Sequence, residues 1–380
     1  MSGAAARLVS LDAFRGFTIA AMVLVNNPGD WGHLYSQLEH AAWNGWTFTD
    51  WIFPFFLFIG GVSMALSLGR LAAAGADKGA LLAKLAKRAA WIFLIGFALN
   101  LIPHFNFATV RIPGVLQRIA LCTMLAAPIV VYCGWRAQLA WIGALLALYS
   151  VIMLLVPVPG FGAGVLEPGK DAGAWQDRLL MDGHLWAHAR TWDPEGVLST
   201  LPALCSTLFG VLAGRWLQSP RALAEQTVWM LLAGLLLLWL GAILDVVLMP
   251  INKSLWTPSF CLFTTGWALL LFSVFYWLLD ACPVPAVKAA AGRWAKPLII
   301  YGMNALFIFA FSGVVAKLLG WIKLAGPDGA PVSLGVVLYA PLRALEIAPV
   351  NSSLLYALIF NAAMFLLAWG MWRKKWFVKV

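Results

Sequence analysis

The sequence predicts an all-α, polytopic transmembrane helix bundle. Of the 380 residues, 62% are hydrophobic and only 11% are charged, and the mean hydropathy is +0.85. Soluble domains have about 25% charged residues, so this composition excludes a soluble fold. Apolar stretches recur from residue 11 to residue 372, and 21 Trp residues suit the interfacial belts of a membrane protein. We therefore expect a single transmembrane domain over residues 1–380.

Ten apolar runs have about the 17–25 residues needed to cross a bilayer. They cover residues 11–28, 51–69, 85–102, 113–133, 137–157, 199–217, 226–249, 258–281, 296–319 and 352–372. A further stretch, 333–348, is amphipathic and contains Pro341, so we expect an interfacial helix there. If this stretch spans the membrane instead, the count is eleven.

The distribution of Lys and Arg predicts the orientation, because cytoplasmic loops are enriched in both. With the N-terminus inside, 16 of the 26 basic residues fall on the inner side and 8 on the outer side. Both termini are therefore expected in the cytoplasm, and the loops 29–50, 158–198 and 320–350 outside. In a membrane protein this distribution means more than the net charge of +10, so we expect lipid around the protein and no nucleic-acid partner.

The first predicted span carries polar side chains on one face. Asp12, Arg15, Ile19, Met22 and Asn26 recur at intervals of three and four residues, which places them on the same side of a helix. Two interpretations fit this face. It is either an Asp12–Arg15 ion pair with an Asn at a helix contact, or the lining of a passage.

Polar groups also lie within later spans, where they mark functional candidates by default. Gln117 and Arg118 fall in the span that follows "RIPGV", and Arg118 requires either a structural acidic partner or an anionic ligand. Asn304 lies three residues after Tyr301 in the span 296–319 and is either a helix–helix hydrogen-bonding residue or a ligand-binding one.

The expected outer loops concentrate imidazoles and carboxylates. His184 and His188 are spaced as metal ligands on a helix would be, but without a third ligand at a fixed spacing we expect no metal. Asp193 and Glu195 precede a predicted span, where acids commonly cap helices. The same residues would suit a cationic or hydroxylated small molecule.

Seven segments carry a family resemblance over nearly the whole chain and in the same order. They are "SLDAFRGFTIAAMVLVNN", "EHAAWNGWTFTDWIFPFFLFIGG", "RIPGVLQRIAL", "DPEGVLSTLPAL", "INKSLWTPSF", "YGMNAL" and "KKWFVKV". Together they resemble the heparan-α-glucosaminide N-acetyltransferase family and its bacterial relatives. The resemblance implies a membrane enzyme that moves an acetyl group from cytoplasmic acetyl-CoA to a glucosamine amine on the far side.

The resemblance carries the family's essential histidine onto His40 and its catalytic asparagine onto Asn26. His40 would be the general base for the sugar ammonium, and Asn26 would stabilise the oxyanion of the thioester carbonyl. An acetyl-histidine intermediate on His40 with ping-pong kinetics is the rival route, and the sequence leaves both open.

Further site residues are expected around these two. Acetyl-CoA contacts are predicted at Asp12, Arg15, Gln117, Arg118 and Asn304, and acceptor contacts at Trp43, Asn44, Asp50, His184, Asp193, Glu195, Lys253 and Trp256. Trp43 would stack on a sugar ring, while Asn44 and Asp50 would hold hydroxyls or orient His40. No metal is expected among them.

Two other functional classes compete with acetyl transfer. A transporter of an amino sugar or its N-acetyl form would also have polar residues on the first span and an acidic outer mouth. A scaffold in an envelope complex does not need Asn26, Arg118 and Asn304 within spans. The resemblance implies an integral protein of a bacterial inner membrane, and it leaves open whether the protein forms a homodimer.

Overall fold

The computed structural model describes residues 8–326 and 329–378. The ends of the expected domain (1–7 and 379–380) and two positions of the loop 320–350 (327–328) lie outside the described residues. The chain divides into two compact units. Unit 1 comprises the described residues of Met1–Glu39, Arg221–Ala233 and Leu269–Lys379, and unit 2 comprises His40–Pro220 and Gly234–Ala268. The fold is helical in both units, as the sequence predicts.

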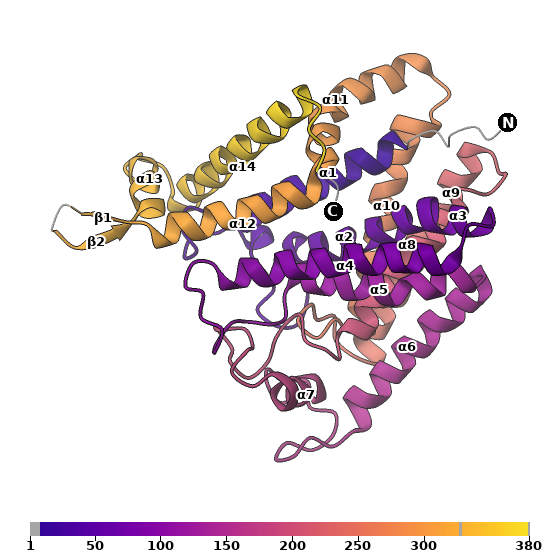
Figure 1. Ribbon diagram of the computed structural model, residues 1–380, viewed down its shortest axis with the longest axis horizontal. Helices are drawn as coiled ribbons and strands as arrows, with labels where there is room; N and C mark the ends of the chain where they lie inside the picture. Colours follow the sequence, from indigo (N-terminus) through magenta and orange to yellow (C-terminus); the bar gives the residue numbers. More distant parts are fainter. Residues whose placement is uncertain (1–7, 327–328, 379–380) are drawn as a thin grey trace. The chain divides into compact units, whose positions relative to one another are not determined.

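Unit 2 contains most of the predicted site. Its elements are α2 (Phe48–Met64), a π-helical turn (Ala65–Gly69), α3 (Arg70–Ala73), α4 (Lys78–Leu101), α5 (Val115–Tyr132), α6 (Trp135–Leu155), α7 (Ala172–Met181) and α8 (Thr200–Trp216). It also contains the second half of α9 (Leu223–Val247) and the first half of α10 (Pro258–Tyr276). Helix α8 packs against α2, α5 and α6, and α4 lies beside α5 (Figure 1).

Glycines bring α2 and α8 into close contact. A Cβ atom at Gly61 would lie 1.9 Å from the carbonyl oxygen of Thr207, and one at Gly210 would lie 2.0 Å from that of Phe58. Both distances are far below van der Waals contact, so only glycine allows this approach of the two backbones. Small residues at helix interfaces are typical of membrane proteins, and this contact fixes the position of α2.

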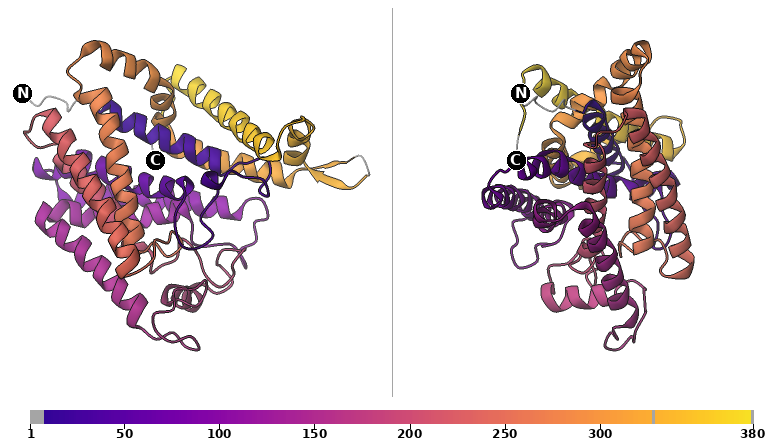
Figure 2. Two further views of the ribbon diagram at one scale, coloured as in Figure 1. Left: turned by 180° about the vertical axis from the view of Figure 1, so that it is seen from behind. Right: turned by 90° about the vertical axis from the view of Figure 1, so that its right-hand side faces the viewer.

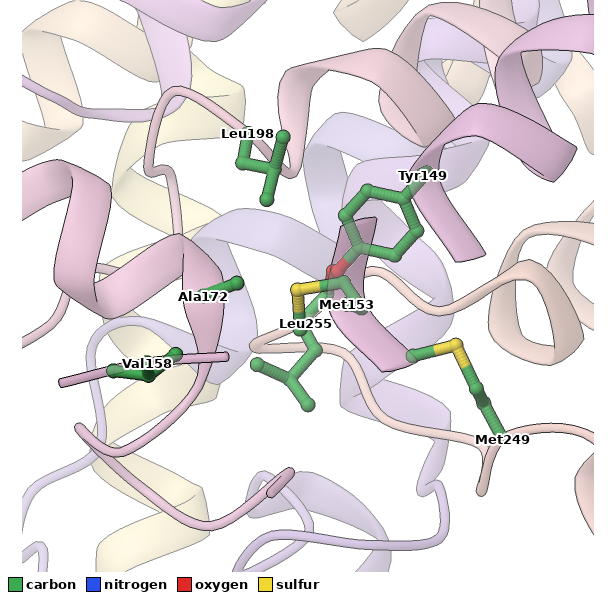
Figure 3. Close-up of a cluster of buried hydrophobic side chains, with 7 residues drawn as sticks. All are labelled: Tyr149, Met153, Val158, Ala172, Leu198, Met249 and Leu255. Atoms are coloured by element: carbon green, nitrogen blue, oxygen red, sulfur yellow. The ribbon is translucent and has the colours of Figure 1, made fainter. Parts of the chain in front are cut away.

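A hydrophobic cluster anchors the long loops of unit 2 to α6. Tyr149 and Met153 of α6 pack with residues from four other segments, namely Val158, Ala172, Leu198, Met249 and Leu255 (Figure 3). The Tyr149 hydroxyl also donates a hydrogen bond to the Leu255 carbonyl at 2.5 Å. The segment 249–257 is therefore held in place at Met249 and at Leu255.

Unit 1 is built around α1 (Val9–Val25). Its other elements are a 3₁₀ turn (Ser36–Leu38), a π-helical turn (Trp277–Ala281), α11 (Pro285–Met303), α12 (Ala305–Trp321), β1 (Lys323–Ala325), β2 (Pro331–Ser333), α13 (Leu334–Arg343) and α14 (Pro349–Arg373). Helix α1 packs against α11, α12 and α14. Strands β1 and β2 pair antiparallel and follow directly from the end of α12 (Figure 2).

The predicted span 296–319 is wrong in one respect, because a break divides it into two helices. Helices α11 and α12 meet at Asn304 and are bent by 71°. The Asn304 backbone leaves helical geometry at φ −123° and ψ 32°. Its side-chain amide donates to the Trp376 carbonyl at 3.0 Å and accepts from Val378 N–H at 2.9 Å. A polar side chain that satisfies the backbone of the C-terminal segment thus marks the break.

Six helices in the described part of the chain are long and apolar enough to cross a membrane, and the bent pair α11–α12 would be a seventh. They include α5, α6, α9 and α14. The expected ten spans are not confirmed. Helices α1 and α8 have only 17 residues each, and the first half of α4 carries Lys84, Lys87 and Arg88. With ten residues, α13 is about 15 Å long, too short to span.

Candidate active site

His40 lies just before α2 and is oriented by an acid in the first turn of that helix. Its Nδ1 atom is 2.7 Å from Oδ1 of Asp50. The His40 side chain is about half exposed (49%), whereas the Asp50 side chain is buried (1%). An ionised carboxylate only accepts hydrogen bonds, so Nδ1 carries the proton in this pair. The second ring nitrogen, Nε2, is then the basic one.

Local structure fixes the Asp50 carboxylate. Its Oδ2 atom accepts hydrogen bonds from Ala41 N–H at 3.1 Å, Thr47 N–H at 2.9 Å and the Thr47 hydroxyl at 3.1 Å. Thr47 and Asp50 form a capping box at the start of α2. The same carboxylate therefore accepts hydrogen bonds from the preceding loop, caps the start of α2 and orients His40. The sequence "HAAWNGWTFTD" encodes all three functions within eleven residues.

A second loop, 249–257, closes over this segment. The Gly45 N–H donates to the Ile251 carbonyl at 2.7 Å, and the Asn252 amide donates to Oδ1 of Asn44 at 3.1 Å. Asn44 is exposed, whereas Asn252 is fully buried. Next along this loop, Nζ of Lys253 lies 3.0 Å from Nε2 and 3.2 Å from Nδ1 of His40. Asn44 and Lys253, both predicted acceptor contacts, thus lie in the same cluster as His40.

Asp193 and Glu195, the two predicted acids of the loop 158–198, both pair with Arg111. Its guanidinium donates to Asp193 through Nε at 2.8 Å and to Glu195 at 2.5 Å. Burial alone would lower the pKa of Arg111, but the hydrogen bond to Asp193 and the charge of Glu195 outweigh it and raise that pKa. Sequence reasoning missed Arg111 as a site residue, although it stands in the motif "RIPGVLQRIAL".

Glu195 links this ion-pair cluster to the histidine electrostatically. Burial raises the pKa of Glu195, but the charges of Arg111, Arg118 and Lys253 outweigh burial and lower it. Lys253 in turn contacts His40. The Glu195 carboxylate therefore interacts electrostatically with Lys253, the residue that contacts His40.

Arg118 is fully buried within unit 2. It donates to the Pro194 carbonyl at 3.0 Å, the Gly196 carbonyl at 2.8 Å and the Ser199 hydroxyl at 2.5 Å. Its guanidinium also lies 5.4 Å from the ring centre of Trp256. These contacts hold the start of α8, so packing accounts for Arg118 in the described structure. Its neighbour Gln117 is also buried, and the Gln117 Nε2 atom has no hydrogen-bond partner among the described residues.

Three predicted acceptor contacts have partners within the protein. The indole of Trp43 donates to the Leu166 carbonyl at 2.8 Å, and its ring meets Trp192 edge-on at 5.1 Å. Nδ1 of His184 lies 2.7 Å from the Val110 carbonyl. Trp256 is 1% exposed, so it has no face open to a sugar. The structure places Trp43 and His184 in loop packing and Trp256 in the core.

The remaining predicted residues lie in unit 1 and are described there alone. Arg15 is partly exposed and pairs with Asp12 at 3.2 Å, which is the ion pair that the sequence left as one interpretation. Asn26 ends α1 and has an exposed side chain. Asn304 binds the backbone of the C-terminal segment, as described above.

The family model described as "Heparan-alpha-glucosaminide N-acetyltransferase, catalytic" matches residues 7–241. Heparan-alpha-glucosaminide N-acetyltransferase of Homo sapiens is 31% identical over 359 residues, which cover 80% of this chain and 52% of the human protein. The Mus musculus protein is 29% identical over 359 residues, which cover 80% and 53% respectively. The chain spans about half the length of these curated relatives.

Proposed function

The chain belongs to the heparan-α-glucosaminide N-acetyltransferase family, and from this premise we propose that it is a transmembrane N-acetyltransferase. The proposed donor is acetyl-CoA, and the proposed acceptor is the amine of a glucosamine-type sugar. The region matched by the family model includes Asn26, His40 and Asp50. An integral membrane protein with apolar helices is the setting that this reaction requires, because donor and acceptor lie on opposite sides of the bilayer.

His40 is the proposed general base. A sugar amine attacks a thioester only in its neutral form, so a base must take the proton that the amine loses. The imidazole is suited to this near neutral pH. Nδ1 of His40 donates its proton to Oδ1 of Asp50 over an Nδ1–Oδ1 distance of 2.7 Å, which leaves Nε2 to receive the proton of the amine. This hydrogen bond between His40 and Asp50 is the observation that carries the proposal.

Asn26 is the proposed oxyanion stabiliser. As the amine adds to the thioester carbonyl, the carbonyl oxygen gains negative charge that a side-chain amide can stabilise. One such donor contributes about 3–4 kcal/mol to the transition state. The position in "LVNN" and the exposed side chain at the end of α1 support this role.

The proposed sidedness follows the charge bias of the loops. Acetyl-CoA is proposed to bind from the cytoplasm, with contacts to Asp12, Arg15 and Gln117. Arg118 and Asn304 are expected in the same set from the sequence, but the contacts described above engage both side chains within the protein. The unpartnered amide of the buried Gln117 supports its place in this set.

The acceptor sugar is proposed to bind at the outer face, which is the side opposite to the predicted cytoplasmic side of both termini. The exposed Asn44 and the acids Asp193 and Glu195 are its proposed contacts. A homodimer, the lipid contacts and the bacterial inner membrane as location stay predictions.

A transfer assay with purified protein in liposomes tests the proposed function. Incubation with [¹⁴C]acetyl-CoA and glucosamine should yield labelled N-acetylglucosamine, and replacement of His40 by Ala should abolish it. The matched control is His33→Ala, because Nδ1 of His33 pairs with Asp30 at 2.8 Å in unit 1 and is not a proposed base. Uptake of the amino sugar without any acetylated product would instead support the transporter.

A further inference from the structure

Lys253 lies over the face of the His40 ring. Its Nζ atom is 3.0 Å from Nε2 and 3.2 Å from Nδ1. Each ring nitrogen forms hydrogen bonds in the plane of the ring, and the two in-plane directions diverge. A group that lies along either direction is therefore close to only one of the two nitrogens. The ammonium group must therefore sit above the ring. The in-plane direction of Nε2 stays available for an acceptor amine.

The loop that carries Lys253 is held rigidly. The fully buried Asn252 accepts from Leu255 N–H at 2.9 Å through its side chain, and its own N–H donates to the Thr257 hydroxyl at 3.1 Å. Trp256 is held at a positive φ of 53° by its buried surroundings. Met249 and Leu255 are fixed in the hydrophobic cluster under this loop (Figure 3). The position of Lys253 is thus determined by the fold.

Acetyl transfer requires a second proton transfer besides the one that His40 performs. When the carbon–sulfur bond of acetyl-CoA breaks, the sulfur leaves as a thiolate that must be protonated. On the basis of the proposed function, we propose that Lys253 is the general acid that protonates this thiolate and is then reprotonated from solvent. The lysine is then a catalytic residue, because it contacts the leaving atom.

In the proposed step, the amine nitrogen forms a bond to the carbonyl carbon, and the amine proton moves to Nε2 of His40. The carbon–sulfur bond breaks, its electron pair goes to sulfur, and the Lys253 ammonium protonates that sulfur. The imidazolium of His40, whose side chain is about half exposed, then releases the amine proton to solvent, and the neutral Lys253 takes up a proton from solvent. The products are the N-acetyl sugar and free CoA thiol, and both side chains regain their starting states.

The charges around the pair favour proton release from Lys253. Once His40 gains a proton, a protonated Lys253 at 3.0 Å would place two cations in contact, so release of the lysine proton relieves the repulsion. Burial lowers the pKa of Lys253, and Arg111 and Arg118 lower it further. The charges of Asp50 and Glu195 oppose this lowering.

Two substitutions separate proton donation from charge. Lys253→Met removes both, whereas Lys253→Arg keeps a positive charge that does not give up its proton at working pH. Both variants should lower kcat by about a hundredfold or more, the range for loss of a general acid, with the KM values for acetyl-CoA and glucosamine within about threefold of wild type. The fall of the wild-type rate at alkaline pH, where Lys253 loses its proton, should disappear in both.

The controls make the result decisive. Lys170→Met removes an exposed lysine that pairs with Glu167 at 2.6 Å and should leave kcat unchanged. Thermal unfolding in detergent checks that each variant is folded, and Lys253→Arg serves if the Met variant is not. An Arg variant within about threefold of wild-type kcat would overturn the proposal, since charge alone would then suffice. A loss confined to the glucosamine KM would overturn it too. A wild type without any transfer would remove the proposed function itself.

Discussion

At the scale of single residues, the central feature is an exposed imidazole held by a buried acid. Asp50 contributes four hydrogen-bond contacts, three from the loop that precedes it and one to His40. An acid in this position sets the orientation and the tautomer of the imidazole, as in other catalytic acid–histidine pairs. The chemistry of His40 therefore depends on a residue that never meets the substrate in the proposed mechanism.

Asp50→Asn should lower kcat by about 10³–10⁴-fold with little change in the KM for acetyl-CoA. The amide can donate to Nδ1, which would shift the ring proton to Nε2 and remove the proposed base. Steady-state kinetics of the transfer reaction measure this. The matched control is Asp30→Asn, which changes the second His–Asp pair and should leave kcat within about twofold. Normal kinetics for Asp50→Asn would contradict the orienting role.

His40→Ala should abolish transfer at neutral pH and leave the fold intact, because the side chain is about half exposed and surface substitutions change stability by about 0.5 kcal/mol or less. If His40 acts only as a base, raising the pH should partly restore the rate, because more of the amine is already neutral. If it carries the acetyl group, no rescue is expected. Wild type mixed with acetyl-CoA alone would then release a burst of free CoA.

A buried acid outside the proposed catalytic pair gives a pH prediction. Burial raises the pKa of Asp177 to about 6, with Asp193 and Asp171 adding to the rise, while Val197 N–H and Arg118 oppose it. The folded protein therefore binds this proton at a higher pH than the unfolded chain, whose ordinary value is 3.8. Stability from this group increases as pH falls from about 6 to about 4 and is lost again above 6.

Asp177→Asn should stabilise the protein at pH 7–8 by up to about 3 kcal/mol, since one pKa unit corresponds to about 1.4 kcal/mol. The asparagine can still accept the Val197 N–H bond, which is 2.9 Å in length. The difference from wild type should shrink to about zero below pH 4. Melting temperatures in detergent across this range provide the test. The exposed Asp182→Asn is the control and should show no such trend; an equal trend there would refute the assignment to Asp177.

At the scale of elements, the contact between α2 and α8 decides where the segment that carries His40 and Asp50 lies. The capping box that holds His40 is the first turn of α2, so any displacement of this helix moves Asp50. Ring stacking also holds α2 against α10, because the ring centres of Trp51 in α2 and Trp267 in α10 are 4.5 Å apart. The site thus depends on helix packing in unit 2 as well as on the loop itself.

Gly210→Ala should destabilise the protein by about 1–3 kcal/mol or more, because overpacking displaces neighbouring backbone. Its Cβ would lie 2.0 Å from the Phe58 carbonyl oxygen. The control is Gly143→Ala in α6, where a Cβ meets no atom within 4 Å. There the substitution should be neutral or stabilise by up to about 1 kcal/mol. Thermal unfolding of both variants would measure this, and equal melting temperatures would contradict the close α2–α8 contact.

At the scale of the whole molecule, membrane topology is the property that determines how the reaction could work. Acetyl-CoA is too polar to cross a bilayer, so a far-side acceptor requires the donor's acetyl group to reach through the protein. Six helices, or seven with the bent pair, meet the length and hydropathy needed to span in the described residues. The 16-to-8 bias of basic residues sets the predicted orientation.

Cysteine labelling tests that orientation. In a Cys133→Ser background, Ala163→Cys in the loop 158–198 should react with an impermeant thiol reagent added outside intact cells. Ala74→Cys, in the loop between α3 and α4, should react only after the membrane is opened. Both positions are exposed, and the other four cysteines are buried. The opposite pattern would reverse the predicted sidedness.

Composition and local pattern alone determined the fold class and the family. Apolar runs predicted helices within a few residues of α5 and α6, since span length depends on local hydropathy. The segment "EHAAWNGWTFTDWIFPFFLFIGG" also singled out His40, and the spacing of His40 and Asp50 across one helix start is short enough for sequence to anticipate. A break at Asn304 was not predicted, because it depends on hydrogen bonds to residues more than 70 positions later.

Only the tertiary structure decided which distant side chains complete the cluster. Lys253 lies 213 positions from His40 in the chain, and Arg111 lies 82 positions from Asp193. No periodicity or capping pattern encodes such pairs, because they arise when the helices pack and bring their loops together. The sequence therefore singled out His40, whereas the packing of the helices determined which charges surround it.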